Sequence, residues 1–127
     1  MGSSFVQNIA IDCADPYALA TFWSAVAGQP VSDEDGPGDP EAVVSLPNGV
    51  DLMFLRVPEP KIVKNRVHIC LRPEQQRRDA EVARIIELGA TLLDDQRNED
   101  GSGWAVLGDP EGNEFCVLRS LAELPAS

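Results

Sequence analysis

Hydrophobic residues alternate with polar ones along the first part of the chain and then recur at the spacing of a helix. The alternation over residues 5–13 predicts a half-buried strand. A helix is expected over residues 16–27, with Asp15 as its N-cap and Gly28 at its end. Its apolar stripe is assigned to the core and consists of Leu19, Phe22, Trp23 and Val26.

Two further apolar runs, residues 42–46 and 50–57, flank the segment 47–49, whose sequence Pro-Asn-Gly is a strong hairpin signal. They predict a pair of antiparallel strands. Residues 58–64 then break the pattern with two prolines and two lysines, as a surface linker between structured segments does.

Similar patterns return after the linker. Residues 66–71 alternate again, which predicts a strand with Arg66, His68 and Cys70 on one face. A polar amphipathic helix is expected over residues 73–88, with its packing stripe at Val82, Ile85 and Ile86. The remaining predicted strands are residues 90–93, 103–107 and 113–118, and residues 109–112 form the last turn.

Each half of the chain therefore runs strand, helix, glycine and further strands, and the halves match at a period of about 60 residues. The matched positions are Asn8 with His68, Gly28 with Gly89, and Met53 with Cys116. The pattern predicts an α+β fold in which two tandem βαβββ modules form a curved mixed eight-stranded sheet around a cavity. We expect one domain over residues 1–127, with modules at about 4–58 and 65–120 and a linker at about 58–64.

Composition narrows the classes of partner. The formal net charge of −11 argues against nucleic acid and against anionic membrane surfaces. No apolar run approaches the ~20 residues of a membrane span and no basic leader is visible, so we expect a cytoplasmic protein. The acidic stretches 32–41 and 94–100 are interpreted as solvated loops. Three cysteines, an odd number within predicted strands, indicate reduced thiols.

A few side chains are candidates for chemistry. His68, the single histidine, either lines a cavity through hydrogen bonds or acts as an acid or base. Arg66 either selects an anionic or carbonyl-rich ligand or pairs with surface acids. Trp104 either stacks on a planar ligand or packs in the core. A Cys116 nucleophile beside His68 lacks visible oxyanion donors, and the glycines near residue 103 lack the lysine of a phosphate loop.

Three local signatures carry a resemblance to a known group. They are residues 12–16 leading into Phe22 and Trp23, residues 65–68, and the run Asp-Pro-Glu-Gly-Asn-Glu-Phe-Cys-Val over residues 109–117. Together with the layout they resemble the vicinal oxygen chelate superfamily, which includes glyoxalase I, extradiol dioxygenases and bleomycin-resistance proteins. The likeness covers nearly the whole chain and is greatest to the small glyoxalase-like branch.

In metal-using members, the resemblance implies, four side chains on the concave sheet faces hold a divalent cation. Those positions fall here on Asn8, His68, Cys116 and either Met53 or Leu55. Only the histidine is a typical ligand, so we predict no metal cofactor. The alternative is a divalent transition metal held by a displaced set drawn from His68, Cys116, Asp12 and Glu114.

The resemblance and the incomplete ligand set predict a metal-independent protein that binds a partly aromatic or carbonyl-rich small molecule. The expected lining residues are Asn8, Asp12, Met53, Leu55, Arg66, His68, Trp104, Glu114 and Cys116. One alternative is an enzyme, a lyase, isomerase or cyclase that uses His68 for catalysis with an atypical metal or none. Another is a structural dimerisation module. Related two-module chains often pair through their sheets, so a homodimer is also expected.

Overall fold

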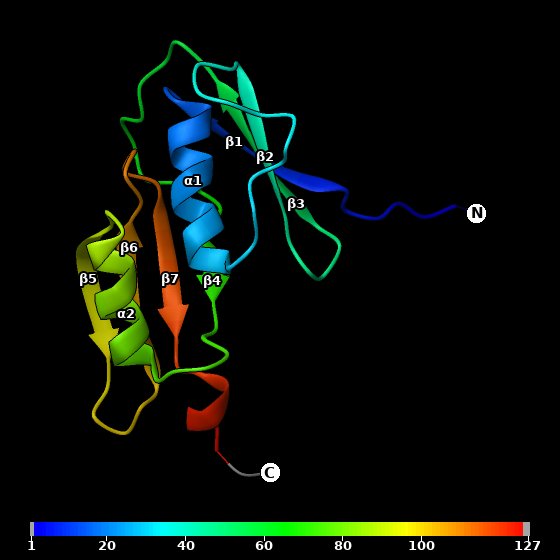
Figure 1. The fold of residues 1–127 in the computed structure, drawn as a ribbon. Helices are drawn as coiled ribbons and strands as arrows, with labels where there is room; N and C mark the ends of the chain where they lie inside the picture. The colour runs from blue at the N-terminus through cyan, green and yellow to red at the C-terminus, as the bar shows by residue number, and fades with distance from the viewer. Residues whose placement is uncertain (1, 126–127) are drawn as a thin grey trace. The chain divides into compact units, whose positions relative to one another are not determined.

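The computed structural model describes residues 2–125, in which seven strands, two α-helices and one short 3₁₀ helix follow one another (Figure 1). The chain divides into two units, Met1–Lys61 and Ile62–Ser127. The boundary between them falls within the segment 58–64 that the sequence assigns to the linker. That the two modules act as one domain stays a prediction.

The first unit has a three-stranded sheet with one helix on it. The strand order is β1-β3-β2, with β1 parallel and β2 antiparallel to β3, and α1 packs on β2 and β3. Beyond β2, Val31 forms a single bridge to Val44. The elements are β1 (Asn8–Cys13), α1 (Pro16–Ala27), β2 (Glu41–Ser45) and β3 (Asp51–Arg56).

The helix α1 forms as its sequence predicts. The Asp15 carboxylate accepts a hydrogen bond from the Ala18 backbone N–H at 3.2 Å, and Gly28 ends the helix at φ 69°. Phe22 and Trp23 are buried and meet edge to face, with ring centroids 5.5 Å apart. Their assignment to the core is confirmed. On the sheet that α1 packs against, the buried side chains are Ala42, Val44, Leu52 and Phe54.

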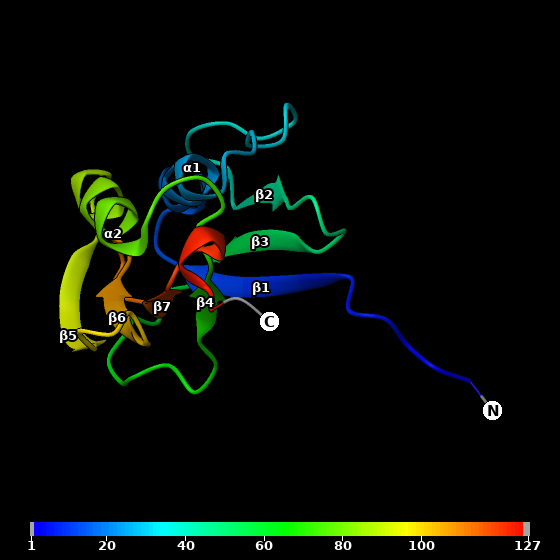
Figure 2. The ribbon, with the colours of Figure 1, turned by 90° about the horizontal axis from the view of Figure 1, so that it is seen from below.

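The second unit repeats the plan with one strand more. Its strand order is β4-β7-β6-β5, with β4 parallel and β6 antiparallel to β7 (Figure 2). The single bridge of Val31 in the first unit occupies the place that β5 takes here, so both units follow one topology. The elements are β4 (Ile69–Leu71), α2 (Arg78–Glu87), β5 (Thr91–Arg97), β6 (Gly103–Gly108), β7 (Glu114–Leu118) and the 3₁₀ helix η1 (Leu121–Glu123).

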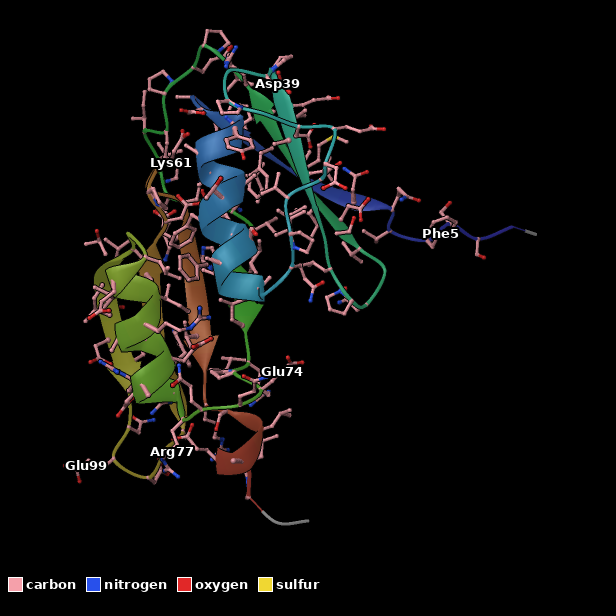
Figure 3. The ribbon with its side chains drawn as sticks, viewed as in Figure 1. Phe5, Asp39, Lys61, Glu74, Arg77 and Glu99 are labelled. Atoms are coloured by element: carbon pink, nitrogen blue, oxygen red, sulfur yellow. The ribbon has the colours of Figure 1, made fainter. Side chains whose placement is uncertain are left out.

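The predicted fold class is confirmed, with the eighth strand reduced to the bridge at Val31. The strands lie in a sheet of three and a sheet of four; a continuous curved sheet stays a prediction. The first strand is shorter than predicted, because pairing with β3 begins at Asn8. Phe5 precedes it on an extended segment (Figure 3) and is 82% exposed.

The helix α2 begins five residues later than the prediction of residue 73. Its first backbone N–H, that of Arg78, donates to the Glu123 carboxylate at 2.7 Å, and the Pro73 carbonyl accepts from the Leu121 N–H. The C-terminal η1 therefore supplies the helix cap and holds the segment before it. The prediction for Ile86 was also wrong: it is partly exposed, whereas Val82 and Ile85 are buried.

The acidic stretch 94–100 is only partly a loop. Its first four residues extend β5 and pair with β6, and ion pairs from Arg97 to Asp95 and to Asp79 satisfy charges on this edge strand. The turn contains Glu99 (Figure 3). Gly103 follows it at φ 85°, where a Cβ would collide with the Gln96 carbonyl.

No helix among the described residues is long and apolar enough to cross a bilayer.

Candidate functional site

The sheet of the first unit has an open face, defined as the face opposite α1. Strand register places its side chains in three rows across β1, β3 and β2. An apolar middle row lies between two rows that are largely polar. The rows are Asn8, Asp51 and Ser45; then Ala10, Met53 and Val43; then Asp12, Leu55 and Glu41.

The four candidate residues of this unit all lie on that open face. Asn8, Met53 and Leu55 are half-buried, and Asp12 is exposed. The face thus offers aliphatic and thioether surface, one amide and carboxylates at its margins. Such a face suits a flat, partly apolar molecule with hydrogen-bonding groups at its edge.

The open face of the second sheet, opposite the buried Phe115 and Val117, carries most of the other candidates. Glu114 and Cys116 lie on β7, and Trp104 lies on β6. In register, Trp104 sits between Leu118 of β7 and Gln96 of β5. It is 44% exposed, so its packing is not that of a core residue, and its indole surface is available for stacking.

His68 and Glu114 meet through Asn65. The Asn65 backbone N–H donates to the Glu114 carboxylate at 2.9 Å, and its side-chain amide donates to the Glu114 carbonyl at 3.3 Å. The His68 Nε2 atom lies 3.0 Å from the Asn65 carbonyl oxygen. Because a carbonyl only accepts, Nε2 is the donor in this contact. In the tautomer that this contact selects for a neutral ring, the lone pair lies on Nδ1.

Arg66 lies in a bend rather than in a strand, which corrects the sequence prediction. The strand β4 begins only at Ile69, because Asn65 uses its side-chain amide to bond the β7 carbonyl at Glu114. Alternation along a strand therefore does not fix the direction of Arg66. Its side chain is exposed. This exposure is the observation that supports a role for Arg66 in attracting an anionic ligand.

The surroundings of Cys116 favour the protonated thiol over the thiolate. Burial raises the pKa of this thiol, the neighbouring Cys70 thiol raises it further, and Lys64 opposes the rise. Only 7% of the residue is exposed. The side chain therefore presents a weak neutral donor at the position where the resemblance implies a metal ligand.

The sequence run 109–117, one of the three signatures of the resemblance, has a structural role. The Asp109 carboxylate is buried in the β6–β7 turn, where it accepts hydrogen bonds from the backbone N–H groups of Glu111 and Asn113 at 2.9 and 3.0 Å and from the Asn113 amide. The carboxylate thus reinforces a turn that two backbone hydrogen bonds also close, from the Gly112 N–H to the Asp109 carbonyl and from the Asp109 N–H to the Asn113 carbonyl. The motif sets the register of β7 and thereby places Glu114 and Cys116.

Two neighbours of the site were not among the sequence candidates. Cys70 pairs in register with Cys116, and Asn65 links His68 to Glu114. The alternation predicted for residues 66–71 had already placed Cys70 on the same face as His68, and this pattern could have identified Cys70 as a candidate. Nothing in the sequence pattern indicated the bonds from Asn65 to Glu114, because they join residues 49 positions apart.

The donors at the family metal positions do not fit a hard divalent cation. Such an ion prefers several oxygen donors, carboxylates above all. The positions that the resemblance implies carry no carboxylate: they offer one neutral amide oxygen at Asn8, an aliphatic or thioether group at Met53 or Leu55, and a thiol with a raised pKa at Cys116. Within residues 2–125, no three His, Cys, Asp or Glu side chains gather at a metal-binding distance.

Comparison with solved structures shows the fold. The oxidase ChaP-H2 is 23% identical with a TM-score of 0.66, and the match covers 94% of each chain. A glyoxalase/bleomycin resistance protein/dioxygenase family enzyme from Burkholderia phytofirmans PsJN is 20% identical with a TM-score of 0.64, over 87% of this chain and 94% of that one. No curated protein matches.

A third structure is a mutant of the genomically encoded fosfomycin resistance protein FosX from Listeria monocytogenes, complexed with Mn(II) and 1S,2S-dihydroxypropylphosphonic acid. It is 15% identical with a TM-score of 0.70 over 97% of each chain. A family profile described as glyoxalase-like domain matches residues 8–118. The resemblance found in the sequence is thus confirmed, and the chain belongs to the glyoxalase-like domain family.

Proposed function

We propose that this chain binds a partly aromatic or carbonyl-rich small molecule without the help of a metal ion. The observation that carries the proposal is the chemistry of the open faces. An exposed Trp104 and half-buried Met53 and Leu55 supply surface for an organic ligand, while Asn8 and the protonated Cys116 take positions where related proteins need metal donors.

Each candidate contributes a distinct interaction in this proposal. Trp104 stacks on an aromatic or conjugated part of the ligand. His68 accepts a hydrogen bond at Nδ1, since its Nε2 proton is held by the Asn65 carbonyl. Arg66 attracts a negatively charged or carbonyl group. Asn8 and Asp12 supply polar contacts on the other open face, and Glu114, engaged by Asn65, orients the His68 loop.

The first test concerns the ligand surface. An aromatic anion, 8-anilinonaphthalene-1-sulfonate, serves as the probe, and its binding is followed by fluorescence titration. We expect Trp104→Ala to weaken binding by roughly tenfold, the equivalent of about 1.4 kcal/mol of lost stacking. The matched control, Ile86→Ala, removes a partly exposed apolar residue from α2 and should leave binding unchanged. Equal losses in both variants would contradict the proposal.

The second test concerns the metal. Protein purified without chelator is analysed for bound ions and then titrated with Ni²⁺, Zn²⁺, Mn²⁺ and Fe²⁺. We expect no stoichiometric divalent ion and no change in probe affinity. An ion bound one to one in the wild type and lost in His68→Ala would overturn the metal-independent mode of binding.

An enzyme of the lyase or isomerase type is the second candidate, and the geometry of His68 favours it. The Nε2 contact with the Asn65 carbonyl orients the ring, so that in this alternative Nδ1 serves as the atom that accepts a proton from a bound substrate. Turnover that disappears in His68→Ala, while probe affinity and the thermal midpoint persist, would distinguish catalysis from passive binding. The homodimer expected from the resemblance stays a prediction, which analytical ultracentrifugation can check.

A further inference from the structure

A buried charged side chain binds the turn that precedes Trp104. Arg78 is the first residue of α2 and is only 4% exposed. Its guanidinium atom Nη1 donates to the backbone carbonyls of three consecutive residues at 3.1, 3.3 and 3.2 Å, those of Gly101, Ser102 and Gly103. Burying a cation is costly unless polar groups surround it, and here the turn supplies those groups.

The turn has little rigidity of its own. Gly101 and Gly103 have positive φ values of 91° and 85°, and glycine has many other conformations open to it at little steric cost. Two backbone bonds hold the turn from within, one between Asn98 and Gly101 and one between Asn98 and Ser102. The bonds from Arg78 come from a different element and act on the residues that lead into β6.

The connection to Trp104 is the peptide unit between Gly103 and Trp104. Because a peptide unit is planar, the Gly103 carbonyl and the Trp104 N–H turn together. The Arg78 bond to that carbonyl therefore constrains the direction in which the chain enters Trp104. Arg78 comes from α2, which packs on one side of the sheet (Figure 2), and its three bonds reach backbone atoms only. Their effect on the indole is thus transmitted through the chain.

The start of α2 is in turn held by the C-terminal η1. The Arg78 backbone N–H donates to the Glu123 carboxylate at 2.7 Å, and the same carboxylate accepts from the Ser120 N–H at 2.9 Å. The Arg78 Nε atom lies 3.6 Å from the Asp79 carboxylate, which is longer than a hydrogen bond. The guanidinium is therefore fixed mainly by its own backbone and by the turn carbonyls.

We propose that Arg78 is a positioning residue for ligand binding. It orders the turn 98–103 and thereby holds Trp104 on the open face in the orientation that stacks on a ligand. This inference rests on the proposed function, because it takes Trp104 as the stacking residue. An indole that is already fixed loses little conformational freedom on binding, whereas without the three bonds a ligand would have to order the turn as well.

The test follows Trp104 by iodide quenching of tryptophan fluorescence in the full chain. Iodide reaches Trp104, which is 44% exposed, and does not reach Trp23, which is 2% exposed. Arg78→Met keeps an unbranched side chain and removes the donors. We expect the quenching constant to rise by up to roughly twofold as the indole leaves the sheet, and the affinity for 8-anilinonaphthalene-1-sulfonate to fall roughly fivefold because ordering the turn opposes binding.

Two further variants separate positioning from stability. Arg78→Lys keeps a cationic nitrogen with three donors and should return both the quenching constant and the probe affinity toward the wild-type values. Ile85→Val removes a methyl group from the buried face of the same helix and leaves the bonds to the turn in place. It should lower the thermal midpoint without changing the quenching constant or the probe affinity.

An unchanged quenching constant in Arg78→Met would overturn the proposal, as would an equal rise in Ile85→Val or a lysine variant that behaves like the methionine one. If Arg78→Met fails to fold, Glu123→Ala takes its place, because it removes the acceptor of the Arg78 backbone N–H. We expect a smaller rise in quenching there, and no rise would be equally fatal. Failure of the proposed function looks different: Trp104→Ala then leaves probe binding unchanged, while quenching still responds to Arg78→Met.

Discussion

The two units share one topology and differ in how their helices are held. In the first, Asp15 caps α1 from the adjacent position. In the second, Glu123 caps α2 from the far end of the unit. The open faces differ as well, since one is built around Met53 and Leu55 and the other around Trp104 and the two thiols. The repeat thus preserves strand order, while capping and surface chemistry vary independently.

The two tryptophans give the largest expected contrast between the units. Trp23 is 2% exposed in the first core, so Trp23→Ala should cost about 3–5 kcal/mol of unfolding free energy through lost burial and a cavity. Trp104→Ala on the open face should cost about 1 kcal/mol or less. Urea denaturation of both variants measures the difference, and similar losses would show that Trp104 is part of a core after all.

The two hairpin turns give the next contrast. Asp109 accepts several hydrogen bonds in its buried turn, so Asp109→Ala should cost about 2–3 kcal/mol. Asn48 in the β2–β3 turn makes one exposed bond of 3.4 Å, and Asn48→Ala should cost about 0.5 kcal/mol or less. Thermal unfolding compares the pair. Equal costs would mean that the Asp109 motif has no special structural role.

These contrasts also explain which features were predictable. The helix α1 was predicted with its correct ends because Asp15, Pro16 and Gly28 act within the helix and next to it. The start of α2 was not, because its cap comes from a carboxylate 45 residues later in the chain. The faces of the candidates on β1, β3 and β7 followed from alternation, which holds wherever a strand is regular.

Arg66 shows where such reasoning fails at the site. Its expected face depended on a strand that Asn65 interrupts with a long-range hydrogen bond, and no local pattern encodes that bond. His68 was identified by its chemistry, but its tautomer depends on the Asn65 carbonyl. Residue types and alternation therefore gave the candidates, whereas hydrogen bonds that no alternation pattern encodes fix the local backbone at Arg66 and the orientation of His68.

The cap on α2 should make the second unit sensitive to acid. The backbone N–H groups of Arg78 and Ser120 lower the pKa of Glu123 from an ordinary 4.5 to about 2. Because the pKa is depressed on folding, this stabilisation is present above about pH 4.5 and is lost as the pH falls toward about 2. Glu123→Gln should cost about 1 kcal/mol at pH 7, after allowance for solvent screening.

The measurement is the thermal midpoint of the wild type and of Glu123→Gln between pH 7 and pH 2.5. The difference between the two thermal midpoints should shrink as the pH falls. Protonation neutralises Glu123 in the wild type, and the glutamine side chain of the variant is neutral at every pH. Asp15→Ala in the first unit is the comparison. It removes the carboxylate that accepts the Ala18 N–H at the start of α1 and should cost about 1 kcal/mol of unfolding free energy. A difference for Glu123→Gln that stays constant with pH would exclude the charged cap.

The smallest expected effect concerns the ion pair on α2, between Glu81 and Arg84 at 2.7 Å. The Arg84 hydrogen bond lowers the pKa of Glu81 against the opposing effect of burial. As a pair at the surface it should contribute about 0.5 kcal/mol, so Glu81→Gln should lower the thermal midpoint slightly. Glu87→Gln on the same helix is the control. The difference should vanish near 1 M salt, where the Debye length falls to about 3 Å; persistence there would assign the effect to packing rather than to charge.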